Sequence, residues 1–523
     1  MTDVNLPQGW LEVTLADIAD WGSGGTPSRK MSHYFCGQIP WIKTGELGNK
    51  FIRSSEEHIT EDAILSSSAK IFPRGSVGIA MYGATIGKTS IFGIDASTNQ
   101  ACAVAIPSQA VNNEFLYYFL LSEKNGFIKA GTGGAQPNIS QGVIKSWPIK
   151  LPPLAEQQRI VAKIEELFSE LDKGVENLRT AQQQLKVYRQ ALLKHAFEGK
   201  LTADWRAQRM DAAQGSASVA GGQEPGATQL ESADALLARI QQEREAHYQQ
   251  QLQEWESNGK AGRKPKAPKA LPPLTGEALA ELPEGWGWFH LAQLLSEDLC
   301  NGKSVKDRNN GFPVLRLNAL GNGRIDLSVT KQGDWSEEEA RPYFVNENDF
   351  LVSRGNGSKH LVGRGGFARY NTTTSEHVAF PDTMIRVRIC QENIDSLYFG
   401  YCWDSFLVRR QIEKSARTTA GIYKINQGLM ERFVIPAPCI EEQKIISTVL
   451  SEKLSLIDQL EQTIAHSLQQ AEALRQSILK KAFSGQLVPQ DPNDEPASVL
   501  LERLYAERAA QPKVRGRKAK VSA

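Results

Sequence analysis

An internal repeat constrains this chain more than any other feature of its sequence. The segment RQALLKHAFEGKL, which begins at Arg189, returns as RQSILKKAFSGQL from Arg475, and LPQGW at Leu6 returns as LPEGW at Leu282. From Ala130 onward the two copies are offset by 286 residues, whereas the offset at the start is 276. A repeat of this length predicts two related structural units, of which the second has about ten extra residues in its globular part.

Each copy begins with a globular part that mixes strands and helices. Short apolar runs at 75–81 and 349–353 predict strands, each followed by a Gly-rich loop, and the apolar spacing at 113–121 and 394–410 predicts helices. We therefore expect an α+β fold, with two globular α/β domains joined by two long antiparallel coiled-coil helices and related by an internal pseudo-two-fold axis.

A long helix follows each globular part, after a boundary set by prolines. The first helix is predicted from about Ala155 to Glu198, roughly 66 Å at about 1.5 Å per residue. Apolar residues spaced alternately by four and three form a seam in both copies. The seam consists of Ile160, Ile164, Leu167, Leu171, Gly174, Leu178, Ala181, Leu185, Tyr188 and Leu192, and of Ile446, Leu450, Lys453, Ile457, Leu460, Ile464, Ser467, Ala471, Leu474 and Ile478. The simplest partner for each seam is the other copy, packed antiparallel.

The repeat and the composition together divide the chain into six parts. We expect globular domains at 1–151 and 282–436, long helices at 152–201 and 437–487, a linker at 202–281, and a short helix with a basic tail at 488–523. Within the linker, 212–229 is rich in Gly, Ala, Ser and Gln, 232–255 is amphipathic, and 260–269 is basic. The basic linker and tail are either solvated segments or phosphate contacts, and both interpretations stay open.

Charge and hydropathy exclude several classes of protein. The 523 residues contain 60 Lys and Arg against 59 Asp and Glu, which excludes a chain that coats DNA by bulk charge but allows local basic faces. No stretch approaches the roughly 20 apolar residues of a membrane span, and the start lacks the features of a signal peptide. We expect a cytoplasmic protein without disulfides or bound metal, because its six cysteines stand singly.

The sequence contains no recognisable catalytic centre. The segment GATIGKT from Gly83 resembles a phosphate-binding loop but is one residue short, and a strand rather than a helix is predicted after Lys88. Pro381-Asp382 lacks the second acid and lysine of a nuclease motif. The two Pro-Pro pairs fit helix boundaries rather than the active site of an adenine methyltransferase, and the eight histidines are scattered.

This organisation resembles the specificity subunit of type I restriction–modification systems over nearly the whole chain. The resemblance rests on the LPxGW openings, on the helix starts LPPLAEQQRIV and APCIEEQKII, and on the two helix ends, all present twice in the same order. It implies two target-recognition domains that read the two halves of a bipartite, asymmetric DNA site. The long helices would then act as a spacer and as a docking surface for two methyltransferase subunits, which a motor and nuclease subunit joins.

The resemblance also assigns the chemistry to the partner subunits. It implies adenine methylation with S-adenosylmethionine, or ATP-dependent cleavage of unmodified DNA with ATP and Mg, and no cofactor in this chain. Two alternatives remain open from the residues. One is an enzyme with an unrecognised site, and the other is a stand-alone DNA-binding or coiled-coil scaffold or inhibitor that acts without methyltransferase subunits.

Candidate DNA contacts are Arg, Lys, Asn, Gln, Ser and Thr side chains in Gly-rich loops, because these groups hydrogen-bond phosphates and base edges. In the first domain they are Thr26, Ser28, Arg29, Lys30, Lys43, Thr85, Lys88, Asn99, Gln100, Thr132 and Gln136. In the second they are Lys303, Lys306, Arg308, Arg316, Asn318, Arg354, Asn356, Ser358, Lys359, Arg417, Thr418 and Lys424. Each is alternatively an ordinary turn or surface residue. The segments 132–138 and 417–424 are favoured, because they occupy the same place in both copies yet differ in chemistry.

Candidate contacts to the methyltransferase subunits lie near the helix ends. They are Arg189, Phe197, Arg475 and Phe483. The alternative is that the helices serve only their mutual packing, which is the interpretation we favour for seam residues such as Leu171 and Ile457.

Overall fold

The structure is a computed structural model that describes residues 6–132, 138–217, 231–260, 264–267, 274, 281–321, 323–369, 377–419 and 421–510. Gln136, part of the expected linker and nearly all of the basic tail lie outside these residues. The chain divides into two compact units. Unit 1 comprises residues 1–180 and 464–523, and unit 2 comprises residues 181–463.

The globular part of unit 1 is built on a mixed sheet. Its strands, in spatial order, are β2 (Ala19–Ser23), β9 (Cys102–Pro107), β6 (Val77–Ala80), β7 (Thr89–Phe92) and β4 (Phe51–Ile52). All neighbours are antiparallel except β7 and β4. A second sheet has the order β5 (Glu57–Ile59), β3 (Ile39–Ile42) and β8 (Ser97–Thr98), and β1 (Leu11–Thr14) pairs with β10 (Pro148–Leu151). Helix α3 (Asn113–Ser122) contributes a run of buried residues to the core.

The globular part of unit 2 repeats this topology. Its main sheet has the order β12 (Cys300–Asn301), β20 (Met384–Val387), β17 (Phe350–Ser353), β19 (Gly365–Ala368), β15 (Gly323–Ile325) and β14 (Leu320–Gly321). The first five strands follow one another with the same directions as the five strands of unit 1, including a parallel pair at the end. β11 (Gly287–His290) pairs with β23 (Val434–Ala437), as β1 does with β10. The predicted α+β fold and its internal repeat are confirmed.

The remaining elements of the globular parts are short. In unit 1 they are α1 (Leu15–Ile18), η1 (Ser32–Phe35), η2 (Thr44–Glu46), α2 (Glu61–Leu65), η3 (Gly83–Thr85), α4 (Lys124–Ala130) and α5 (Gln141–Lys145). In unit 2 they are η5 (Leu291–Leu294), β13 (Asp307–Leu315), η6 (Leu317–Ala319), β16 (Thr330–Gly333), α9 (Glu337–Ala340), η7 (Arg341–Tyr343), β18 (Gly355–Asn356), α10 (Ser396–Asp404), α11 (Phe406–Ser415), β21 (Arg417–Thr419), β22 (Ile422–Lys424) and α12 (Gln427–Met430). The single helix predicted at 394–410 is instead two helices, α10 and α11, which meet at the buried Ser405.

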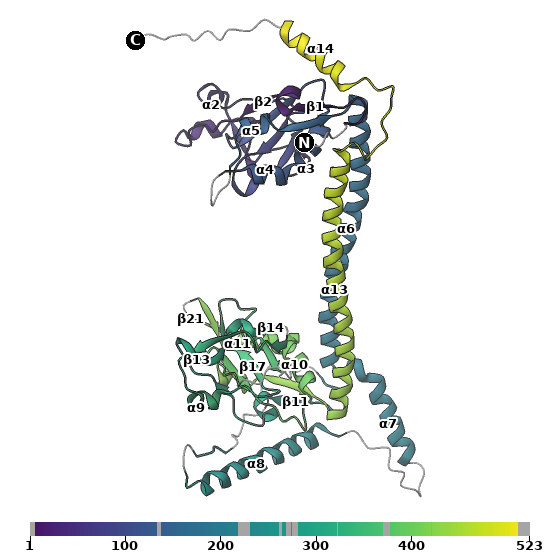
Figure 1. The fold of residues 1–523 in the computed structure, drawn as a ribbon. Helices are drawn as coiled ribbons and strands as arrows, with labels where there is room; N and C mark the ends of the chain where they lie inside the picture. The colour runs from purple at the N-terminus through teal and green to yellow at the C-terminus, as the bar shows by residue number, and fades with distance from the viewer. Residues whose placement is uncertain are drawn as a thin grey trace. The chain divides into compact units, whose positions relative to one another are not determined.

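Two long helices pass through both units. Helix α6 covers Leu154–Phe197, within one residue of its predicted bounds, and α13 covers Ile440–Ala482, inside the predicted segment 437–487. In each unit the two helices run antiparallel and side by side (Figure 1). In unit 1, Ile164 shares a core with Ile478, and in unit 2, Leu192 shares a core with Leu450.

The helix seam departs from the predicted heptad positions at several places, three of which carry large apolar side chains. Tyr188, Leu460 and Leu474 are 49%, 43% and 51% exposed, whereas Phe168 and Leu454, outside the predicted seam, are buried. A straight helix with about 3.6 residues per turn drifts away from a strict repeat of 3.5, so a fixed heptad frame loses register along its length. Tyr188 and Leu474 occupy equivalent positions in the two copies. Both copies therefore have a large, mainly apolar side chain at the same exposed position of the long helix.

A buried glutamine anchors the start of each long helix. The Gln157 Oε1 accepts a hydrogen bond from the backbone N–H of Asn112 at 2.8 Å, and its Nε2 donates to the carbonyl oxygens of Ala110 and Pro152, both at 3.0 Å. Gln443 makes the same three bonds, with Asp395 N–H at 2.9 Å, Asn393 O at 3.2 Å and Pro438 O at 2.8 Å. Both side chains are fully buried. The repeated Glu-Gln of the sequence is thus a structural anchor.

The segment after each long helix returns to a globular part. Gly199 and Gly485, at the two helix ends, have φ of +70° and +73°, and a Cβ there would stand 2.5 and 2.4 Å from Pro283 and Pro7 Cγ. The prolines belong to the LPxGW openings, so the repeated glycines and prolines are explained together. Beyond the glycines, α8 (Ala233–Ser257) packs on unit 2 and α14 (Ala497–Ala510) packs on unit 1.

One helix in the linker was not predicted. After η4 (Lys200–Thr202), α7 extends over Ala203–Ala217 and includes the first residues of the segment expected to be an irregular linker at 212–229. The boundary of that linker is therefore wrong at its N-terminal side, because the Ala- and Gln-containing sequence there supports a helix.

Candidate nucleic-acid interface

A hairpin and a loop that are far apart in the sequence meet in unit 2. Strands β21 and β22 pair with each other, and β22 pairs with β18, the short strand in the loop that follows the central strand β17. Arg417 lies opposite Lys424, which in turn lies opposite Gly355. The side chains of Arg417, Thr418 and Lys424 are exposed. Three of the predicted residues are therefore brought beside the predicted loop at 354–359.

The same arrangement occurs in unit 1. Tyr82, at the end of the central strand, forms a β-bridge with Asn138, which bridges to Thr132. The Thr85 hydroxyl donates to the Tyr82 carbonyl at 2.8 Å and closes the loop. Gln136 lies outside the described residues. The structure therefore repeats the pairing of hairpin and loop with unlike residues, Tyr82 and Asn138 in one copy and Gly355 and Lys424 in the other.

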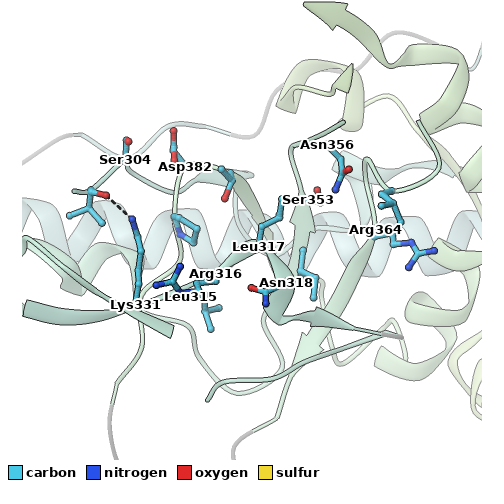
Figure 2. A pocket seen from close by; sticks show the side chains of 15 residues that line it. Ser304, Leu315, Arg316, Leu317, Asn318, Lys331, Ser353, Asn356, Arg364 and Asp382 are labelled. Carbon is cyan, nitrogen blue, oxygen red and sulfur yellow. Dashed lines mark hydrogen bonds between the residues drawn. The ribbon is translucent and has the colours of Figure 1, made fainter. Parts of the chain in front are cut away.

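A pocket of about 620 Å³ with both apolar and polar lining residues opens in unit 2 (Figure 2). It collects three predicted residues, Arg316, Asn318 and Asn356. Six further polar lining residues were not predicted: Ser304, Lys331, Ser353, Arg364, Asp382 and Thr383. Asp382 had been considered only as a nuclease carboxylate, and Arg364 stands in a Gly-Arg-Gly-Gly turn that resembles the selected loops.

Internal hydrogen bonds hold the loop at 354–359 in place. The Arg354 guanidinium donates to the carbonyl oxygen of Asp382 at 3.4 Å, and the Asn356 Oδ1 accepts the backbone N–H of Ser358 at 3.1 Å. No hydrogen bond of the Asn356 amide nitrogen occurs within the described residues, and Asn356 is part of the pocket lining. Lys359 is exposed and ends this loop.

The ribbon formed by β13 and β16 presents further cations, partly neutralised. Lys331 Nζ lies 2.7 Å from Asp307, and this contact lowers the pKa of the Asp307 carboxyl. Arg308 pairs with Asp334 at 2.7 Å. Lys303 Nζ lies 5.9 Å from the Trp335 ring centroid, and Lys306 is exposed. Every one of these groups is at the surface, where ion pairs are weak and exchange readily with phosphate.

In unit 1, two predicted cations share one carboxylate. Arg29 lies 2.6 Å from Glu57, and Lys43 Nζ lies 3.2 Å from Glu57 and 2.9 Å from Glu56. Hydrogen bonds from Arg29 and Lys43 lower the pKa of Glu57, and the contact with Glu56 raises the pKa of Lys43. The Arg29 guanidinium also lies over the Phe35 ring, 4.2 Å from its centroid. The structure places Arg29 and Lys43 together but engages both within the protein.

The other predicted residues of unit 1 fall into two places. Thr26 donates its hydroxyl hydrogen to the Gln100 side chain, which follows Asn99 in the turn before β9. Ser28 and Lys30 are exposed in the loop before η1. Lys88 precedes β7, so a strand follows it, as predicted, and the geometry of a phosphate-binding loop is absent from this described segment.

The four predicted partner contacts prove to be unlike one another. Phe197 is 1% exposed and packs against the Tyr398 ring at 5.3 Å, so its prediction as a partner contact is wrong because it is a core residue. Phe483 is half-buried against Phe115. Arg189 pairs with Asp458 across the helices of unit 2, and Arg475 pairs with Asp172 in unit 1. Both arginines therefore hold the helices together and keep only part of their surface open.

The described residues contain no helix that is long and apolar enough to cross a membrane. Nor do three or more His, Cys, Asp or Glu side chains come together in the described ranges as metal ligands would.

Sequence comparisons place the chain among DNA specificity proteins. A model of the family described as type I restriction modification DNA specificity domain matches residues 7–179. The chain is 24% identical over 532 residues to the type I restriction enzyme EcoKI specificity subunit of Escherichia coli K12, covering 98% of both chains. It is 32% identical over 189 residues to the Escherichia coli EcoR124I/EcoR124II specificity subunit, covering 34% of this chain and 47% of that protein.

Structural comparison agrees. A chain from a study of complex assembly and conformational transition of a type I R-M system aligns with a TM-score of 0.63 at 18% identity, over 92% of this chain and 99% of that chain. The HsdS subunit from Thermoanaerobacter tengcongensis aligns with a TM-score of 0.50 at 17% identity, over 93% and 100%. With the repeated fold, the family match over residues 7–179 and similarity along its whole length, this chain is similar throughout to the specificity subunits of type I restriction–modification systems.

Proposed function

We propose that the chain is the non-catalytic DNA-recognition subunit of a type I restriction–modification complex in the cytoplasm. Its two globular domains read the two halves of a bipartite, asymmetric site. The observation that carries this proposal is the pairing of hairpin and loop, which occurs on the same scaffold in both units with different side chains. Two readers with the same frame and unlike surfaces recognise two unlike half-sites, whereas a homodimer of one reader recognises a palindrome.

The proposed DNA contacts are groups in these loops for which no ion pair is found within the described residues. In unit 2 they are Arg316, Asn318, Asn356, Arg417, Thr418 and Lys424, with support from Lys303, Lys306, Arg354, Ser358 and Lys359. In unit 1 they are Thr85, Thr132, Asn99, Gln100, Ser28 and Lys30. Arg29 and Lys43 are left out because carboxylates engage them.

The proposed partners are two methyltransferase subunits and a motor and nuclease subunit. These subunits would bind S-adenosylmethionine, ATP and Mg and perform adenine methylation or DNA cleavage. Support for docking comes from the paired helices, which expose large apolar side chains: Val187 and Leu456 are 68% and 56% exposed in unit 2, and Leu474 is 51% exposed in unit 1. Exposed aliphatic groups on a helix pair are suited to contact with further helices.

Mapping methylated adenines in the host genome with and without this gene tests the proposal. We expect one bipartite motif of two unlike half-sites to lose methylation when the gene is deleted and to regain it when the gene is restored. An unchanged methylation pattern, in a host whose methyltransferase subunit is expressed, would contradict the proposal and favour a stand-alone scaffold or inhibitor.

A further inference from the structure

Lys43 and Arg316 occupy the same position in the two copies. Each follows the strand that runs beside the main sheet, β3 in unit 1 and β13 in unit 2, and each precedes a short 3-10 helix. Both residues have extended backbone, with ψ of 152° and 155°. The two positions are therefore built alike, and any functional difference between them comes from their neighbours.

The neighbours of Lys43 are carboxylates. Glu56 and Glu57 hold its Nζ at 2.9 and 3.2 Å, and the Glu46 carboxylate accepts its backbone N–H at 2.8 Å. A lysine with two carboxylates in contact presents little net charge to a ligand. The first copy therefore uses this position for its own structure.

The neighbours of Arg316 leave its guanidinium open. Its Nε donates to the Thr330 carbonyl at 3.1 Å, and its backbone N–H donates to the Val329 carbonyl at 3.0 Å. Asp307 is the acidic group whose charge interacts with Arg316, but the Asp307 carboxylate is held by Lys331 at 2.7 Å. Within the described residues, the two terminal nitrogens of Arg316 have no hydrogen bond or ion pair. The guanidinium is held at its Nε, and its two terminal NH₂ groups are free to bind a ligand.

Arg316 belongs to the lining of the pocket (Figure 2). Leu315, Leu317 and Leu361 supply an apolar part of the lining, and Asn318 and Asp382 supply further polar groups. An apolar surrounding strengthens hydrogen bonds to a ligand because it lowers the local dielectric constant. A guanidinium held by Nε with two free terminal NH₂ groups matches the paired O6 and N7 acceptors that guanine presents in the major groove.

We infer that Arg316 is a specificity-determining residue that reads a guanine in the half-site of the second domain. The inference rests on the proposed function, since it assumes that this domain contacts DNA. Arg316 supplies the bidentate donor, and the Thr330 carbonyl acts as the positioning group that fixes its orientation. Lysine at this position keeps the charge but has no planar fork, so the two residues differ in base selection rather than in attraction to phosphate.

The test is a methylation map of a host that carries the intact complex with Arg316→Ala, Arg316→Lys or wild-type sequence. We expect a guanine in one wild-type half-site, and we expect both variants to accept other bases at that position, with discrimination reduced roughly 5- to 150-fold. The other half-site should stay unchanged. Arg341→Ala, which removes an exposed arginine of the same unit outside the pocket, is the control and should leave the motif intact.

Three results would overturn the inference. They are a motif without guanine in either half-site, an unchanged motif in Arg316→Ala, and an unchanged motif in Arg316→Lys, which would show that charge alone acts there. Thermal unfolding of both variants at the wild-type temperature excludes misfolding as the cause of a relaxed motif. Failure of the proposed function is distinct, because the wild-type gene would then direct no bipartite methylation at all.

Discussion

Trp10 donates a hydrogen bond from its indole Nε1 to the buried carboxylate of Glu156 at 3.0 Å. The bond joins the LPxGW opening to the start of the long helix, two motifs that are 146 residues apart. Gln490, from the segment after α13, donates to the other oxygen of Glu156 at 3.2 Å. One carboxylate therefore ties together three parts of unit 1. In unit 2 the equivalent Glu442 binds Thr202 and Arg206 instead. The carboxylate near the start of the long helix is therefore hydrogen-bonded in both copies, but by different donors.

The Glu156 carboxylate should make stability depend on pH. Burial raises its pKa above the ordinary value of 4.5, because desolvation outweighs the hydrogen bonds from Gln490 and Trp10. The folded state thus binds a proton more readily than the unfolded state, and this stabilisation is fully present below pH 4.5 and lost as the pH rises through the folded pKa. Glu156→Gln does not titrate, so its Tm relative to wild type should rise between pH 4.5 and 7.5.

Thermal unfolding of both proteins across that range measures the effect. Glu170→Gln, at an exposed position of the same helix, is the matched control and should show a constant difference from wild type. A Tm difference between Glu156→Gln and wild type that does not change with pH would contradict the assignment.

The buried pair of Glu442 and Arg206 should be strongly coupled. The two residues are 1% and 7% exposed, and Thr202 donates its hydroxyl hydrogen to the same carboxylate at 2.6 Å. Glu442→Ala should lower the free energy of unfolding by about 3–5 kcal/mol, because it leaves the arginine charge buried without its anion. Removing both charges, in Glu442→Leu with Arg206→Met, should cost less than the sum of the single changes. Urea unfolding of Glu442→Leu, Arg206→Met and the double variant gives the coupling energy. Strictly additive changes in the free energy of unfolding would contradict the predicted coupling.

Gln157 and Gln443 should be needed for stability to a similar degree. Alanine at either position leaves a backbone N–H and two carbonyl oxygens without their partner, and each unsatisfied buried group costs about 1–3 kcal/mol. Both single variants should therefore unfold at lower urea concentration than wild type. Gln158→Ala is the control, because this exposed glutamine lies next in the sequence. Equal midpoints for Gln157→Ala and Gln158→Ala would show that the three hydrogen bonds contribute nothing net.

Sequence reasoning succeeded where structure depends on local pattern and failed where it depends on tertiary neighbours. The bounds of α6 follow from periodicity and prolines, whereas the need for glycine at position 485 depends on a tertiary contact with Pro7. That Lys43 is neutralised could not be predicted, because Glu56 and Glu57 reach it only through the pairing of β3 with β5. The same holds for the pocket, whose lining residues come from several separate segments of the sequence.

The burial of Phe197 shows the same limit for partner surfaces. A large apolar residue at a helix end indicates either a core or a docking site, and periodicity does not distinguish the two. The Phe197 ring packs against the Tyr398 ring, with centroids 5.3 Å apart, so Phe197 is part of the core. For Tyr188 and Leu474 the prediction was wrong in the opposite direction. Their seam spacing predicts burial, but both side chains are about half exposed.

The exposed apolar positions on the long helices should serve partner binding. Leu456 is 56% exposed on α13, so Leu456→Glu should leave thermal unfolding unchanged while it weakens association with the methyltransferase subunit. The measurement is co-purification of the tagged chain with that subunit from cells that express both. Leu65→Glu, at an 82% exposed leucine in unit 1, controls for the added charge and should bind normally. Normal yield of the complex with Leu456→Glu would remove this position from the docking surface.

Arg417 should contribute directly to base recognition. It is exposed in β21, opposite Lys424, and it belongs to a hairpin that differs in chemistry from the equivalent segment of the first copy. Arg417→Ala should weaken specific binding of the assembled complex by about 1–3 kcal/mol and relax one position of the target, because an arginine that reads a base edge contributes that much discrimination. Titration of cognate and mismatched duplexes at several salt concentrations measures both effects, with the exposed Arg410→Ala on α11 as control. If affinity instead falls equally for all duplexes and the salt slope drops by about one, Arg417 binds phosphate and the base-reading assignment is wrong.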